Sequence, residues 1–198
     1  FKLTASWKHD SRDSAIFPTQ GFAQRLSGVL TIPGRDLQCY KLSYNFSHYL
    51  PLYRKLTFSS SGDVAYGDGY GSTEELPFFE NFYAGGEKSV RGYKTNTLGP
   101  VDSLGDPIGG NIKLVGGLAL FMPAPVADLG DTLRLTAFFD FGNVYRNKVE
   151  LSELRASTGL SILWLSPVGA LTFSYAFPIN DQEGDELQAF QFTLGSAF

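Results

Sequence analysis

The feature that most constrains the fold of this chain is a two-residue alternation of apolar and polar side chains that recurs along its length. In residues 40–46 the apolar side chains occupy the even positions, and in residues 171–177 they occupy the odd positions. Successive side chains of a β-strand point to opposite faces, so this pattern indicates strands with one apolar and one polar face. Nine such segments, each of about ten residues, are expected.

Two details favour a membrane barrel over a soluble β-sandwich, which would alternate in the same way. The segments are longer than the strands of soluble sheets, which usually have about five or six residues. Aromatic side chains gather at the segment ends, at Tyr40, Tyr49, Tyr66, Tyr145, Phe177 and Phe198. Membrane barrels carry aromatic girdles at these levels. We therefore predict an all-β fold, an antiparallel up-and-down transmembrane β-barrel.

The composition agrees with this class and excludes several others. Glycine supplies 22 residues, phenylalanine 17 and tyrosine 10, whereas only 18% of the residues are charged. The net charge of −4 argues against a nucleic-acid partner. A single cysteine, Cys39, excludes an internal disulfide framework and gives no metal cluster, and no cofactor is expected. No apolar run is long enough for a membrane helix, and no signal peptide is recognisable. The chain opens in mid-pattern at Phe1, as expected for a fragment of a longer precursor.

The connectors between the segments fall on two sides, and one of them is unusually long. One side holds 10–21, 51–55, 123–130 and 166–168, and the other holds 33–37, 68–109, 146–154 and 178–187. Membrane barrels have short periplasmic turns and longer extracellular loops, so the second side is expected to be extracellular. Connections of about forty residues are usually functional or disordered. The glycines and aromatics of 68–109 indicate a packed loop.

Several motifs resemble those of one known family. Within the long loop these are Phe82–Gly86, Val90-Arg91-Gly92-Tyr93 and Asn96–Pro100. Matching segments elsewhere are Phe17–Gly21, Thr31–Gly34, Tyr66–Gly69, Trp164–Pro167, Phe173–Ala176 and Phe190–Phe198. Together they resemble the BamA family, the central barrels of the outer-membrane β-barrel assembly machine. The resemblance covers essentially the whole chain, and its loop motif resembles the sixth extracellular loop of that family.

The resemblance implies a function and a set of partners. Family members have a sixteen-strand barrel preceded by POTRA domains, so residues 1–198 would be the C-terminal part of the barrel, with no POTRA domain. The expected function is to fold and insert other outer-membrane proteins in Gram-negative bacteria. The expected partners are the outer-membrane lipid bilayer, unfolded outer-membrane protein substrates and, through POTRA domains, the lipoproteins of the assembly machine.

The resemblance also implies which residues of the loop are functional. In the family the arginine matching Arg91 lies on a loop that folds into the lumen, where it meets an aspartate and an aromatic of a strand. Asp140 and Phe138 match these partners, and alternation independently places both on the polar face. A guanidinium beside a carboxylate and over a ring is a favourable arrangement. Ala119 stands where the family has a further glutamate. The alternative is a solvated surface arginine.

The terminal strand is the second expected site. By resemblance, Phe190, Phe192, Leu194, Gly195 and Phe198 form a C-terminal targeting signal and one half of a lateral seam. The simpler interpretation is that these aromatics only contact lipid. Glycine has no side chain to pack, so weak pairing or a kink is expected at Gly195.

Two other functions and one physical problem follow from the sequence. A secretion pore of the same superfamily would export one partner protein. An outer-membrane enzyme, such as a lipase or protease barrel, would need a nucleophile and a base, and the sequence contains no such constellation, so no enzyme is expected. Nine strands are an odd number for a simple antiparallel barrel, so exposed edges are expected around 3–8 and 190–198.

Overall fold

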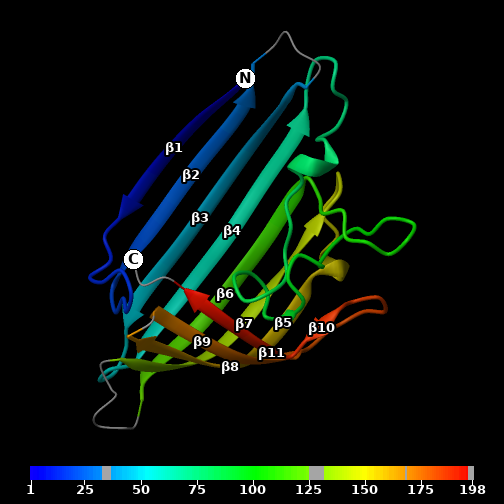
Figure 1. Cartoon of the computed structure of the whole chain (residues 1–198). Coiled ribbons are helices and arrows are strands. Elements are labelled where there is room, and N and C mark those ends of the chain that lie inside the picture. Colours follow the sequence, from blue (N-terminus) through cyan, green and yellow to red (C-terminus); the bar gives the residue numbers. More distant parts are fainter. Residues whose placement is uncertain (33–36, 125–131, 168, 196–198) are drawn as a thin grey trace.

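The computed structural model of the chain describes residues 1–32, 37–124, 132–167 and 169–195. In these residues, nine strands form one antiparallel sheet in the order β1-β2-β3-β4-β6-β7-β8-β9-β11 (Figure 1). Their bounds are β1 Lys2–Asp10, β2 Gly21–Thr31, β3 Cys39–Pro51, β4 Thr57–Gly69, β6 Ile112–Pro123, β7 Leu133–Tyr145, β8 Arg155–Ser166, β9 Gly169–Pro178 and β11 Phe190–Gly195. The predicted all-β, up-and-down antiparallel fold is confirmed.

The remaining elements are short. Strands β5 (Gly92–Tyr93) and β10 (Leu187–Gln188) pair with each other as a separate two-stranded sheet. The described residues contain two single turns of 3₁₀-helix, η1 (Phe78–Glu80) and η2 (Leu151–Glu153). In the same part of the chain, no helix has the length and apolar character needed to cross a membrane.

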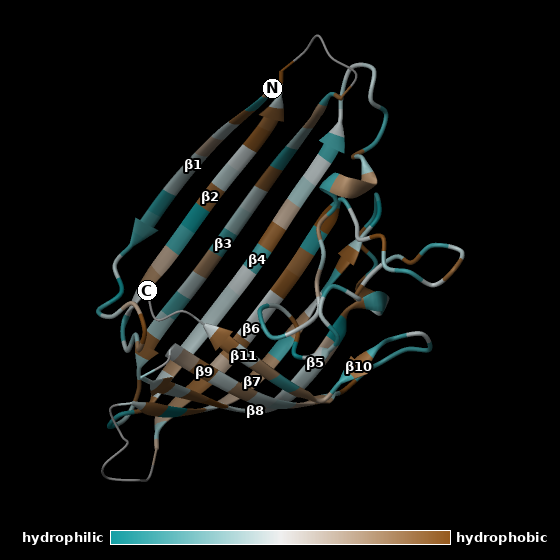
Figure 2. Ribbon diagram, viewed as in Figure 1, coloured by the Kyte–Doolittle hydropathy of each residue, from teal (hydrophilic) through white to brown (hydrophobic). Residues whose placement is uncertain are grey.

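The sheet exposes its apolar face and buries much of its polar face, the reverse of a soluble protein. In β9, Tyr175 and Phe177 are exposed, whereas the neighbouring Ser174 and Ala176 are buried. Other exposed apolar side chains of the sheet include Leu3, Trp7, Leu42, Leu118, Phe139, Leu160, Phe190, Phe192 and Leu194. The alternation is visible as bands of hydrophobic and hydrophilic residues along β1 to β4 (Figure 2). An outer face of this kind suits lipid rather than water.

One of the aromatics expected in a girdle has a different position. Tyr145, at the end of β7, is only 1% exposed. Tyr66 and Phe177, in contrast, are exposed as a girdle requires. The backbone of Gly110 approaches Tyr145 so closely that a Cβ built on Gly110 would lie 2.3 Å from the Tyr145 carbonyl oxygen. The backbone of the long loop, as it returns into β6, therefore lies against the backbone at this end of β7.

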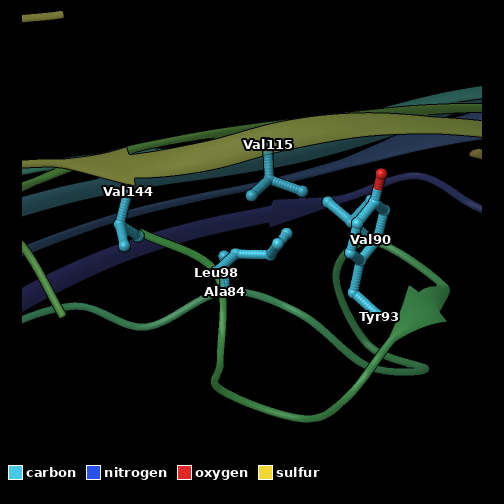
Figure 3. Close-up of a cluster of buried hydrophobic side chains, with 6 residues drawn as sticks. All are labelled: Ala84, Val90, Tyr93, Leu98, Val115 and Val144. Carbon is cyan, nitrogen blue, oxygen red and sulfur yellow. The ribbon is translucent and has the colours of Figure 1, made fainter. Parts of the chain in front are cut away.

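The long connection between β4 and β6 lies on the inner side of the curved sheet (Figure 1). It carries η1 and β5 and packs a small apolar cluster against the sheet, made of Ala84, Val90, Tyr93, Leu98, Val115 and Val144. Val115 of β6 and Val144 of β7 extend from the sheet toward the loop residues (Figure 3). This buried cluster thus joins the loop to the wall and holds the loop in one shape.

The sheet is open, with β1 and β11 as its two edge strands. The expected pair of edges is therefore present. Each edge strand uses one side of its backbone for its neighbour, β2 or β9, and offers the other side for pairing.

Candidate functional site

Arg91 lies on the long loop and forms a bidentate contact with Asp140 of β7. Its Nε donates a hydrogen bond to Asp140 Oδ2 at 2.6 Å, and its Nη2 donates to Oδ1 at 2.9 Å. The backbone N–H of Arg91 donates to Oδ2 as well, at 3.2 Å. The guanidinium carbon lies 3.4 Å from the centre of the Phe138 ring. The structure therefore brings Arg91 together with both of its expected partners.

The arrangement follows from the periodicity of β7 and from burial. Phe138 and Asp140 are two residues apart, so their side chains leave the strand on the same face. The Asp140 side chain is 4% exposed and that of Arg91 is 16% exposed. Two parallel N–H···O bonds replace the water that the carboxylate loses on burial. Removing either partner would leave a buried charge without compensation.

The other residues of the Val90-Arg91-Gly92-Tyr93 motif hold the backbone of Arg91 in position. Val90 and Tyr93 are fully buried in the apolar cluster. Gly92 has φ +89°, and a Cβ there would lie 3.1 Å from Ala176 Cβ on β9, so both its backbone conformation and its close approach favour glycine. Burial raises the pKa of Tyr93 to about 12, and its hydroxyl donates to the Ala156 carbonyl at 3.4 Å.

A second carboxylate reaches this region from the loop itself. Ala119 lies opposite Phe138 in the β6–β7 ladder and offers no carboxylate. Glu87, four residues before Arg91, accepts a hydrogen bond from Ser174 Oγ of β9 through Oε1, at 2.9 Å. Its Oε2 is buried and has no hydrogen-bond partner among the described residues. Burial raises the pKa of Glu87, while the Ser174 hydrogen bond and the charge of Arg91 act in the opposite direction.

We expect the docked loop to lose stability as the pH rises above about 4.5, the ordinary pKa of a glutamate. The folded protein holds the proton of Glu87 at pH values where the unfolded chain has released it, so the contribution of Glu87 falls until the pH passes its raised pKa. Glu87→Gln cannot ionise, and its unfolding midpoint should therefore fall less than that of the wild type across this window. Urea unfolding of the full-length protein at several pH values measures the difference; parallel curves for the two proteins would contradict the prediction.

An earlier part of the loop is attached to the first strands. Glu80 of η1 forms an ion pair with Lys2 of β1. Lys41 of β3 donates from Nζ to the Glu80 carbonyl at 2.6 Å and lies 4.7 Å from the centre of the Phe82 ring. Burial alone would raise the pKa of Glu80, but the hydrogen bonds and charges of the two lysines outweigh it and lower that pKa. The loop therefore contacts both the early and the late strands of the sheet.

The terminal strand presents its expected residues to the outside. Phe190, Phe192 and Leu194 are 56%, 52% and 59% exposed. The ladder with β9 continues through Gly195, which lies opposite Ala170, so pairing is maintained up to this glycine. Phe198 lies outside the described residues.

Sequence reasoning missed four residues that make polar contacts between the loop and the sheet: Glu80, Glu87, Ser174 and Gln191. Gln191 of β11 is 5% exposed, and its Nε2 donates to the Tyr93 carbonyl at 2.7 Å. Alternation did place Ser174 and Gln191 on the polar face, but no pattern in the sequence indicates which loop residue will lie against them. Among the described residues, no group of three potential metal ligands comes together.

Comparison with known proteins places these features in a family. The model of the Omp85 superfamily domain matches residues 1–198. The outer membrane protein assembly factor BamA of Neisseria meningitidis serogroup B is 38% identical over 228 residues, covering 100% of this chain and 29% of that protein. The mouse sorting and assembly machinery component 50 homolog is 30% identical, covering 96% of this chain and 44% of that protein. The chain thus spans less than half the length of these relatives.

A solved structure agrees with the sequence relatives. The crystal structure of BamA from Haemophilus ducreyi lacking POTRA domains 1–3 matches with a TM-score of 0.91 and 34% identity, covering 99% of this chain and 42% of that chain. The sequence-based resemblance to BamA is confirmed. With its open antiparallel sheet, its outward apolar face and this match over its whole length, the chain belongs to the Omp85 superfamily.

Proposed function

We propose that the chain forms the C-terminal part of a barrel in the outer membrane of a Gram-negative bacterium, and that the complete protein folds and inserts other outer-membrane proteins. The relative with 38% identity over the whole chain is named as an assembly factor of this kind. The outward apolar side chains supply the surface that a lipid bilayer requires. The role is not enzymatic: the curated BamA relatives are named as assembly factors.

The observation that carries the proposal is the buried contact of Arg91 with Asp140 and Phe138. This contact supports the prediction that the loop 68–109 packs into the lumen instead of extending into solvent. The loop is bonded to β1 and β3 through Glu80 and to β7 and β9 through Arg91 and Glu87. These contacts can keep the sheet curved while an edge strand remains available for pairing with a substrate strand.

The edge strand is the proposed point of contact with substrates. An edge offers a row of backbone donors and acceptors, and an unfolded strand can pair with it by β-augmentation. In the complete protein, β11 would form half of a lateral seam through which such a strand is released into the bilayer. The further partners, the lipoproteins of the assembly machine, would bind outside this chain, through POTRA domains.

The proposal is tested by depleting the full-length protein in its own bacterium and measuring several unrelated outer-membrane β-barrels. We expect all of them to decline together and unfolded precursors to accumulate. The alternative, a secretion pore, would leave their levels unchanged and would stop the export of one partner protein. That outcome would replace assembly by secretion as the function.

A further inference from the structure

Two polar residues on the last strands lie side by side beneath the long loop. Ser174 of β9 and Gln191 of β11 are direct partners in the β9–β11 ladder. They are 1% and 5% exposed, so each needs a hydrogen-bond partner inside the protein. Both find it on the loop: Ser174 donates to Glu87 at 2.9 Å, and Gln191 donates to the Tyr93 carbonyl at 2.7 Å.

These two loop residues flank Arg91. Tyr93 follows it by two positions and is fully buried, and Glu87 precedes it by four. The motif therefore holds β7 through Arg91 and the β9–β11 pair through its neighbours on either side. The backbone between these attachments has little room to move, because Gly92 lies close to Ala176 of β9.

The segment before β11 is attached to the same part of the loop. Gly92 pairs with Gln188 and Tyr93 pairs with Leu187, in the two-stranded sheet of β5 and β10. The Lys94 N–H donates to the Glu186 carbonyl at 2.8 Å, and the side chains of these two residues form an ion pair at 2.5 Å. The loop thus contacts Glu186, Leu187 and Gln188 before the terminal strand and Gln191 within it.

We propose that Gln191 is a positioning residue that clamps the terminal strand to the loop motif, which Ser174 holds against β9, so that β11 can leave the wall only when it separates from Tyr93. The clamp deepens the proposed function, on which its significance rests, by making the position of the seam strand depend on the docking of the loop. The amide of Gln191 is suited to this task because it donates to a backbone carbonyl and so does not depend on the side chain at position 93.

The first test is hydrogen exchange of the full-length protein in a bilayer, comparing Gln191→Met with Thr193→Val. Methionine keeps the length of the side chain and removes the donor. Thr193 is the next residue of β11 on the same face, which makes it the matched control. Loss of one hydrogen bond should raise the exchange rate of the peptide covering residues 190–195 about fivefold to tenfold, with little change in the control.

The second test is a rescue, in which a covalent bond between the loop and the segment before β11 replaces the lost hydrogen bond. Cysteines in Lys94→Cys/Glu186→Cys replace two exposed side chains at paired positions, where a disulfide can form. The only natural cysteine of this chain, Cys39, is buried. Oxidation should restore slow exchange of residues 190–195 in the Gln191→Met background, and reduction should abolish the rescue.

The results of these two tests can be told apart from a failure of the proposed function. Equal exchange in Gln191→Met and Thr193→Val, or no rescue by the disulfide, would overturn the clamp. These readouts need no assembly reaction, so they stand even if the wild-type protein proves unable to assemble other barrels. In an active protein, the oxidised disulfide should slow assembly severalfold and reduction should restore it; full activity of the oxidised form would also overturn the clamp.

Discussion

Replacing Arg91 by alanine is expected to destabilise the folded barrel by about 3–5 kcal/mol, because the substitution leaves Asp140 as a buried charge without a partner. Arg91→Lys should give a smaller loss, since lysine keeps the charge but has neither the two-pronged donor geometry nor the planar group that stacks on Phe138. The free energy of unfolding in urea, measured for the full-length protein in a bilayer, checks both expectations.

A second ion pair of the same chain provides the control. Arg146 donates to Glu75 at 2.6 Å, the same length as the Arg91 Nε bond, but the two side chains are 58% and 54% exposed. Exposed pairs contribute at most about 1 kcal/mol, so Arg146→Ala should have little effect. If Arg91→Ala were as mild as Arg146→Ala, the loop would not be held by this contact.

The second large effect is expected on the outer face. Leu160 lies near the middle of β8 and is 63% exposed. If this face meets lipid, Leu160→Arg should destabilise the folded protein by about 2–4 kcal/mol, the cost of an arginine near the bilayer midplane. A soluble surface would tolerate the same change within about 0.5 kcal/mol, so the experiment separates a membrane face from an aqueous one.

Asn45→Arg is the matched substitution on the inner face. Asn45 lies near the middle of β3, is exposed and stands between Arg25 of β2 and Asp63 of β4 in the two ladders. We expect this variant to fold with nearly wild-type stability, because the new arginine faces a polar space and the attraction of Asp63 opposes the repulsion by Arg25. Equal stability of the two arginine variants would mean that the assignment of the faces is wrong.

Most of the fold could be predicted from the sequence because alternation is a local property. The residues of each strand indicate which positions share a face, as in 171–177. In an up-and-down sheet, consecutive strands are neighbours, so the strand order follows from the order in the sequence. Tyr145 shows where local reasoning ends: its place at a strand end predicted a girdle position, but its side chain is buried. Local alternation carries no information about which other segments pack over the end of a strand.

Some residues of the candidate site could likewise be predicted from the sequence, and others could not. Arg91, Phe138 and Asp140 could be predicted because a family motif and the parity of β7 both point to them. Glu87 could not, because a glutamate in a loop resembles any solvated charge until the loop is seen against Ser174. The attachment of Gln191 to a backbone carbonyl was equally hidden, since any residue at position 93 would provide that acceptor.

The most direct test of the account is the assembly reaction itself. The full-length protein is reconstituted in liposomes and supplied with an unfolded outer-membrane β-barrel, whose folding is followed over time. We predict that the wild type and Arg146→Ala accelerate folding of the substrate equally, and that Arg91→Ala, compared at equal amounts of folded protein, is severalfold slower. Folding of the substrate at the rate of empty liposomes with the wild type, or at the full wild-type rate with Arg91→Ala, would contradict the account.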